Sequence, residues 1–505
     1  MTKDEQFDRL ASRVEMLGDL RGGSVRSAAY TTMAGIGSFV IRIGSTMVLA
    51  RLVLPEHFGL LAMVAAVVAF AEQFRDLGLS TATVQAETVN RQQVSNLFWI
   101  NVSCGGLIAV VVAALAPALV WFYDDARLLP VTLAIAAAPL LGGLGVQHQA
   151  LLTRQMKLGR ISSIRVASSL LSVLLAIGLA LKGAGYWALV VREVSRSAFT
   201  AVGMWMTCRW IPSRPARADG MGKIIGLGGN LTVANMLGSF VDNVDKVLLG
   251  NFFGPQATGF YRQAQFLVSA PMDQVLGPIF RVSEPGLSSL QNDPRRYRAY
   301  YRKIVSVISL ATMPLSVLLA VYAREFTLIL LGNEWLGAVE LFRILCLATF
   351  LRPSIWTSHS VLITLGKGRQ YLYLKIAEHI VFLSLVSVGI LFGAVGVAAA
   401  SPVSAFLLMA PTLWYCFRDS PVNQGVFWVA VTKPFLSSLA MAGALHSMNE
   451  VFPLSHSVLA VLRGGTVGAV VYLACFCLLP RGFRELRILT EDVLGAFHRK
   501  TANLG

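Results

Sequence analysis

Long apolar segments separated by short polar gaps run through most of the chain. A helix that crosses the hydrocarbon core of a bilayer needs about 20 predominantly apolar residues. By that measure the sequence predicts about fourteen transmembrane helices. They lie at residues 27–49, 58–76, 94–121, 129–147, 161–181, 184–206, 224–250, 257–281, 304–322, 338–363, 371–392, 394–416, 430–447 and 457–479. We therefore expect an all-α integral membrane protein.

The basic residues between these spans predict an orientation. If the gaps are numbered along the chain, the even gaps are rich in arginine and lysine, whereas the odd gaps hold only Arg51, Arg127, Lys182 and Arg324. Cytoplasmic loops of membrane proteins carry an excess of lysine and arginine. The even gaps, and with them both termini, are therefore predicted to lie in the cytoplasm.

The spans also show an internal repeat. Pro55 and Gly59 follow the first span, and Pro255 and Gly259 follow the seventh. An even number of spans separates the two copies, so they have the same orientation, as in a parallel repeat of two six-helix lobes. Chance similarity between apolar segments is the alternative.

The repeat predicts how the chain is divided into lobes and terminal segments. The predicted segments are a cytoplasmic leader at 1–24, an N-terminal lobe at 25–206, a C-terminal lobe at 207–420, two additional transmembrane helices at 421–480 and a cytoplasmic basic tail at 481–505. The leader has apolar residues at helical spacing, which indicates either an amphipathic surface helix or a solvated segment.

Composition agrees with a membrane protein. The chain is 55% hydrophobic and 14% charged, whereas soluble domains carry about 25% charged residues. The net charge of +16 is distributed between apolar segments. Membrane orientation explains that distribution better than binding to nucleic acid does, and we expect no nucleic-acid partner.

Ionisable side chains inside the predicted spans are the candidate functional residues, because such residues are costly in a bilayer and are rarely exposed to lipid. The candidates for substrate binding are the cations Arg42, Arg192, Arg196, Lys246 and Arg352. The candidates for binding a coupling ion are Asp242, Asp245 and Glu193. Arginine forks match phosphate oxygens, so the abundance of arginine predicts an anionic group on the substrate.

Two interpretations of the charges in span 184–206 stay open. Arg192 and Arg196 are four residues apart and share one helix face, while Glu193 can pair with Arg196. If all three faced lipid they would cost roughly 8–10 kcal/mol on insertion scales. They therefore either line a water-filled cavity that faces the substrate or form a structural ion pair.

The other candidates have structural alternatives too. Asp242 and Lys246 are four residues apart and can form a local ion pair, which leaves Asp245 available to Arg42. Arg352 directly precedes a proline. A proline in a transmembrane helix breaks the hydrogen-bond ladder, and such breaks are tolerated where they line a cavity.

No sequence pattern indicates catalysis or a bound cofactor. The chain lacks a phosphate-binding G-x-x-x-x-G-K-[ST] loop, a G-x-S-x-G nucleophile elbow and metal-ligand spacing. The polar loops are short, which leaves no room for a soluble catalytic domain. The acidic pair Asp124-Asp125 is best interpreted as a solvated turn. We expect a transporter without a cofactor and not an enzyme.

Several short motifs occur in order along the chain. They are Pro55-Glu56-His57-Phe58-Gly59-Leu60, Phe74-Arg75-Asp76-Leu77-Gly78-Leu79-Ser80, Thr83-Val84-Gln85, Asn243-x-Asp245-Lys246-x-Leu248-Leu249-Gly250 and Gly259-Phe260-Tyr261. Over roughly residues 25 to 420, the chain resembles bacterial polysaccharide flippases of the Wzx type. These belong to the superfamily of multidrug, oligosaccharidyl-lipid and polysaccharide exporters.

The resemblance implies a function at the bacterial inner membrane. The expected substrate is an undecaprenyl-diphosphate-linked oligosaccharide, flipped to the outer leaflet by alternating access for surface or exopolysaccharide biosynthesis. Cationic cavity residues would hold the diphosphate, and the lipid tail would stay among the membrane lipids. A polysaccharide polymerase and co-polymerase are the implied protein partners. Related exporters use Na+ or H+ gradients, and no residue here selects between them.

Two alternatives to the flippase remain. A multidrug exporter would share the fold, although a cavity rich in arginine disfavours a cationic drug. A membrane-embedded glycan polymerase or ligase would need a long outer loop with paired catalytic groups, which the sequence lacks.

Overall fold

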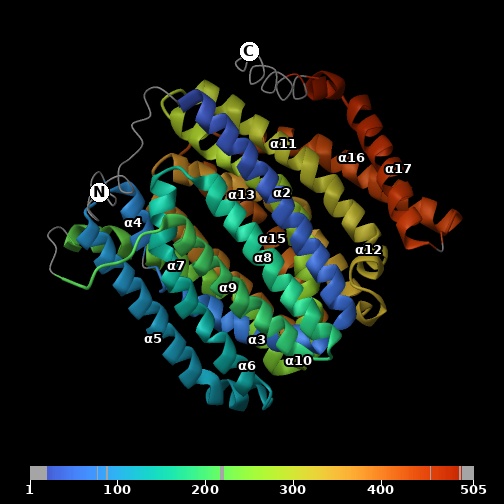
Figure 1. Cartoon of the computed structure of the whole chain (residues 1–505). Helices are drawn as coiled ribbons and strands as arrows, with labels where there is room; N and C mark the ends of the chain where they lie inside the picture. Colours follow the sequence, from blue (N-terminus) through green and yellow to red (C-terminus); the bar gives the residue numbers. More distant parts are fainter. Residues whose placement is uncertain are drawn as a thin grey trace. The chain divides into compact units, whose positions relative to one another are not determined.

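The computed structural model describes residues 20–76, 78–86, 89–216, 221–454, 456–487 and 491, with side chains left out at 20–34 and 221–242. The secondary structure of the described residues is helical and contains no strand (Figure 1). Most of the predicted leader and most of the predicted basic tail lie outside the described residues. The chain divides into two compact units, Met1–Arg262 and Gln263–Gly505.

The described residues of the first unit form eight helices and the first part of a ninth. They are α2 (Leu20–Leu52), α3 (Pro55–Glu72), α4 (Leu79–Gln85), α5 (Arg91–Tyr123), α6 (Leu128–Ile135), α7 (Ala137–Arg154), α8 (Leu158–Leu181), α9 (Tyr186–Cys208) and α10 (Met221–Ser289). Helix α8 packs against α2 and α9, and α7 packs against α5 and α9 (Figure 1).

The second unit contains the end of α10 and the remaining helices. They are α11 (Pro294–Val321), α12 (Ala323–Leu330), η1 (Asn333–Trp335), α13 (Ala338–Thr364), α14 (Gly368–Gly389), η2 (Ile390–Phe392), α15 (Gly393–Phe417), α16 (Gln424–Val451) and α17 (Ser457–Leu478). Helix α11 packs against α13 and α16, while α15 packs against α13 and α14.

Every predicted span overlaps a helix. Spans 224–250 and 257–281 both lie in α10, which is kinked at Gly254, where φ is 75°. Glycine tolerates this left-handed conformation because it lacks a Cβ. Among the described residues, nine helical stretches are long and apolar enough to cross a membrane, one of them running through both α14 and α15. The all-α membrane fold is confirmed, whereas the count of fourteen spans stays a prediction.

Polar residues in the gaps start several of these helices. Before α5, the Asn90 side chain accepts a hydrogen bond from the backbone N–H of Gln93, and the Gln93 side chain accepts one from the backbone N–H of Asn90. Before α11, the Asp293 side chain accepts hydrogen bonds from the backbone N–H groups of Arg295 and Arg296, and a proline follows it at the first helical position. Such caps satisfy backbone N–H groups that have no partner inside the helix.

Hydroxyl groups connect helices inside the second unit. The Tyr301 hydroxyl is 2.9 Å from the Thr357 hydroxyl, and the Ser309 hydroxyl is 2.8 Å from that of Ser354. All four side chains are buried. Apolar surface does not drive helix association in a bilayer, so small residues and interhelical hydrogen bonds take a larger part. These contacts hold α11 against α13.

The two copies of the Pro/Gly motif touch each other within the first unit. A Cβ added to Gly59 of α3 would overlap the Pro255 carbonyl of α10, and one added to Gly259 would overlap the Pro55 carbonyl. The contact is therefore reciprocal, as it is across a two-fold axis. The parallel repeat and the lobe boundaries stay predictions.

Candidate anion-binding site

Three of the predicted residues meet on α9. The Glu193 carboxylate lies between two guanidinium groups. Arg192 Nη2 is 3.0 Å from Oε1, and Arg196 Nη2 is 2.9 Å from Oε2. Residues three apart face each other on adjacent helical turns, so the predicted Glu193–Arg196 ion pair is confirmed. Arg192 shares the same carboxylate, which leaves the three side chains with a net positive charge.

The two arginines differ in exposure. The Arg192 side chain is 16% exposed and that of Glu193 is 26% exposed, whereas that of Arg196 is 52% exposed. Arg192 is thus held within the helix packing, and Arg196 reaches an open space. Of the two, Arg196 is the better placed to meet a ligand.

Arg262 of α10 is a fourth member of this cluster, and the sequence reasoning missed it. Its charge interacts with those of Arg192 and Glu193. Its Nη1 atom is buried and has no hydrogen-bond partner among the described residues. The sequence does contain an indication of its role. Arg262 directly follows the Gly259-Phe260-Tyr261 motif and lies in 257–281, the most polar predicted span.

Arg196 also lines a cavity of about 400 Å³. The walls come from α7, α8 and α9 and from the C-terminal end of α3. Arg75 and Arg165 line it as well, together with one acidic residue, Glu72. Arg75 donates to Glu72 at 3.1 Å, and Arg165 donates to Gln149 at 3.1 Å. We call this space, with its three arginines and one glutamate, the arginine cavity.

The predicted charges of α10 have local partners. Asp245 is 3% exposed, and one of its carboxylate oxygens accepts a hydrogen bond from the Tyr261 hydroxyl at 2.6 Å. Lys246 Nζ donates to the Asn243 side chain at 3.2 Å. The Asp242 side chain lies outside the described residues, so its predicted pairing with Lys246 stays a prediction.

Neither Arg42 nor Arg352 is among the described residues that line the arginine cavity. Arg42 is exposed on α2, and its backbone carbonyl accepts a hydrogen bond from Ser45. Arg352, on α13 in the second unit, donates to the Ser401 hydroxyl at 3.2 Å. Its guanidinium lies 5.6 Å from the centre of the Trp356 ring, a cation–π distance.

The second unit also brings together a polar cluster that sequence reasoning did not predict. His359 Nε2 on α13 is 2.9 Å from Glu378 Oε1 on α14. Lys375 Nζ is 2.9 Å from Glu378 Oε2, and the Thr412 hydroxyl donates from α15 to Oε1. The cluster links three helices and satisfies its carboxylate with protein donors.

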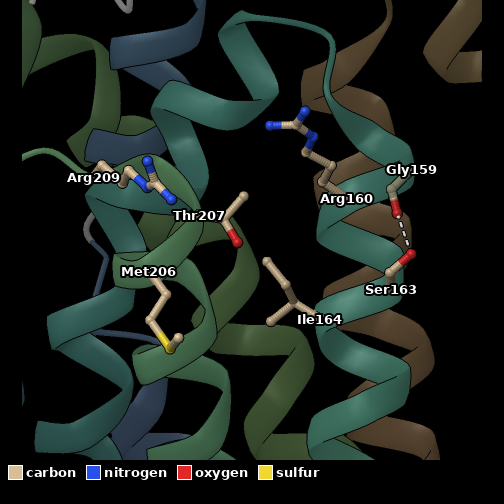
Figure 2. A pocket seen from close by; sticks show the side chains of 7 residues that line it. All are labelled: Gly159, Arg160, Ser163, Ile164, Met206, Thr207 and Arg209. Atoms are coloured by element: carbon tan, nitrogen blue, oxygen red, sulfur yellow. Dashed lines mark hydrogen bonds between the residues drawn. The ribbon is translucent and has the colours of Figure 1, made fainter.

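A wider cavity of about 840 Å³ lies at the ends of α8 and α9 (Figure 2). Figure 2 shows Arg160 of α8 and Arg209, just after α9, on opposite sides of the opening, with Ile164 and Met206 below them. Its described lining contains none of the predicted site residues. Arg160 is therefore a suitable control for arginines of the arginine cavity, since it is an exposed arginine of the same unit.

The chain matches a known family over more than half of its length. Residues 48–340 match the model described as "Polysaccharide biosynthesis protein". The chain is 26% identical to the teichuronic acid biosynthesis protein TuaB of Bacillus subtilis over 379 residues, which cover 74% of this chain and 78% of that one. It is 23% identical to the succinoglycan biosynthesis transport protein ExoT of Rhizobium meliloti over 471 residues, covering 90% and 93% of the two chains.

The fold is similar to that of a solved transporter. The lipid II flippase MurJ, in an inward closed conformation, superposes with a TM-score of 0.71 at 13% sequence identity, covering 90% of this chain and 99% of that chain. This likeness shows a shared multi-pass membrane fold. The family match confirms what the sequence motifs indicated. The chain belongs to the family of polysaccharide biosynthesis proteins.

Proposed function

We propose that this protein is a flippase of the bacterial inner membrane. It moves a lipid-diphosphate-linked oligosaccharide from the cytoplasmic to the outer leaflet for surface or exopolysaccharide biosynthesis. Family membership and the fold shared with a lipid II flippase support this proposal. The observation that carries it is the arginine cavity, where Arg75, Arg165 and Arg196 face one acidic side chain. Such an excess of guanidinium groups suits a diphosphate.

Arg196 is the residue best placed to bind the diphosphate. Its guanidinium already holds one anion, the Glu193 carboxylate, at 2.9 Å. A phosphate oxygen would replace Glu193 as the partner of this guanidinium or share it. The free energy gained on phosphate binding is therefore smaller than it would be for a guanidinium that has no partner. A transporter benefits from such moderate affinity because it must also release its substrate. Arg192 is more buried and positions Glu193 for this exchange.

The lipid tail is proposed to stay in the bilayer while the sugar head passes through a polar space. Rocking of the two halves of a parallel repeat gives alternating access. Both termini are proposed to face the cytoplasm, following the distribution of basic loops. A polysaccharide polymerase and co-polymerase are the proposed partners that receive the product.

A Na+ or H+ gradient is the proposed source of energy, and Asp245 is the candidate acid whose role we propose to test. It is almost fully buried and bonded to a neutral hydroxyl group, that of Tyr261. Asp245→Asn should abolish the dependence of export on the gradient. Unchanged gradient dependence in that variant would exclude Asp245.

The test of transport compares Arg196→Ala, Arg196→Lys and the control Arg160→Ala in a strain that lacks its own flippase. Surface polysaccharide and protein abundance are measured together. Hydrogen bonds to charged groups contribute about 1.5–3 kcal/mol. Because Glu193 already occupies Arg196, only part of this is gained on binding, and Arg196→Ala should lower export about five- to tenfold. Arg196→Lys should restore part of the export, and Arg160→Ala should export as much polysaccharide as the wild type. Full export by Arg196→Ala at normal abundance would contradict the proposal.

The same strain separates the flippase from its alternatives. Without a flippase, the lipid-linked unit stays in the inner leaflet, where an added sugar-binding protein cannot reach it in intact spheroplasts. Without a polymerase or ligase, single units collect in the outer leaflet and become accessible. A multidrug exporter would instead change resistance to cationic drugs, which the arginine cavity repels.

A further inference from the structure

A cavity of about 610 Å³ in the second unit has no part in the proposed transport site. It lies between α11, α16 and α17 and the segment that follows α17. The described residues that line it include four cations and one acid, namely Arg302, Lys303, Arg481, Arg484 and Glu485. The cavity is therefore strongly electropositive.

The acidic residue is already occupied by two cations. Arg302 Nη2 is 2.8 Å from Glu485 Oε1, and Lys433 Nζ is 2.6 Å from Oε2. This shared carboxylate fixes the segment after α17 to α11 and α16. Neither Arg481 nor Arg484 has an ion pair or a side-chain hydrogen bond within the described part of the chain. Both remain available to an external anion.

The deeper wall of the cavity is apolar. Ala430 and Pro434 of α16 and Phe476 of α17 contribute to it, and all three are buried. A basic rim above an apolar wall suits a molecule with a negative head and a hydrocarbon chain. A free inorganic anion would use the rim alone.

The cations of the rim come from segments that the distribution of basic loops assigns to the cytoplasmic side. Anionic lipids give the cytoplasmic leaflet a negative surface potential, and basic pockets between transmembrane helices on that side bind their head groups. The pocket thus opens where such lipids are present at high concentration.

We propose that this pocket binds the phosphate head group of an anionic phospholipid of the cytoplasmic leaflet. Arg481 and Arg484 contact the phosphodiester, and an acyl chain lies against Phe476. The bound lipid joins the two C-terminal helices to α11 through its own contacts, beside the Glu485 ion pairs. This binding is independent of the transported substrate.

The test uses the purified full chain in a neutral detergent, with bound lipids counted by native mass spectrometry. The probes are phosphatidylglycerol, phosphatidylcholine and inorganic phosphate. The test variant is Arg481→Gln/Arg484→Gln. The control is Arg295→Gln/Arg298→Gln, which removes two exposed arginines from the start of α11, outside the pocket lining.

The wild type should retain phosphatidylglycerol in preference to phosphatidylcholine. The test variant removes the two cations that contact the phosphodiester. The test variant should therefore raise the Kd for phosphatidylglycerol about thirtyfold, which corresponds to about 2 kcal/mol. The control should change it less than about twofold.

Three results would overturn the proposal. The first is an unchanged Kd in the test variant, and the second is equal retention of the neutral lipid by the wild type. The third is displacement of phosphatidylglycerol by millimolar inorganic phosphate, which would identify a free-phosphate site. If the double variant melts at a lower Tm than the control, the single Arg484→Gln variant decides, with an expected weakening of about fivefold.

Discussion

Replacing Glu193 with alanine should destabilise the protein more than replacing either arginine that it binds. The substitution removes the carboxylate that pairs with both Arg192 and Arg196, and it leaves Arg192 with the like charge of Arg262. Replacing one arginine, by contrast, leaves Glu193 with the other as its partner. The order of the three variants in loss of stability therefore shows how strongly each arginine interacts with Glu193.

The magnitudes follow from the exposure of each partner. Breaking a buried ion pair by removing one partner costs about 3–5 kcal/mol, whereas an exposed pair contributes about 0–1 kcal/mol. Arg192 is 16% exposed and resembles the first case, while Arg196 is 52% exposed and resembles the second. Because Glu193 is itself partly exposed, we expect a loss of about 2–4 kcal/mol for Glu193→Ala. The expected losses are about 1–2 kcal/mol for Arg192→Ala and below about 1 kcal/mol for Arg196→Ala.

The assay is equilibrium unfolding of the purified protein in mixed micelles. A double-mutant cycle should give a larger coupling energy for Glu193 with Arg192 than for Glu193 with Arg196. Glu193→Gln keeps the shape of the side chain and removes its charge, so it should lose nearly as much stability as Glu193→Ala. Equal losses for Arg196→Ala and Glu193→Ala would refute this reasoning.

Three further predictions concern other parts of the chain. Gly259→Ala places a Cβ against the Pro55 carbonyl, so we expect a loss of about 3 kcal/mol or more, seen as little monodisperse protein in size-exclusion chromatography. Glu485→Ala removes the partner of two cations and should cost about 1–2 kcal/mol, measured by unfolding in lipid-free detergent. Burial alone would raise the pKa of Asp125, but hydrogen bonds from Arg127 and its charge outweigh burial and lower that pKa. The Asp125–Arg127 pair therefore stabilises the protein above the ordinary carboxyl pKa of about 3.9, and this stabilisation is lost as pH falls through the lowered pKa of Asp125. Arg127→Ala should remove this acid dependence of the Tm.

The sequence was sufficient for features set by local chemistry. Apolar length predicted the helices, and helical spacing predicted the Glu193–Arg196 pair, since both residues belong to one helix. It was not sufficient for contacts between helices. His359 and Glu378 are 19 residues apart on separate helices, and Arg262 reaches the α9 cluster from α10. No periodicity within a single helix encodes which faces of two helices meet.

The close crossing of α3 and α10 accounts for the few positions that the two copies of the predicted repeat share. Each contact joins the α-carbon of a glycine to the carbonyl of a proline in the other copy. Such a contact constrains the main chain at the proline and the glycine. It sets no requirement on the side chains of the residues between them. The residues between the proline and the glycine are Glu-His-Phe in one copy and Gln-Ala-Thr in the other. A contact of this kind can thus persist while the side chains between the proline and the glycine change in chemistry.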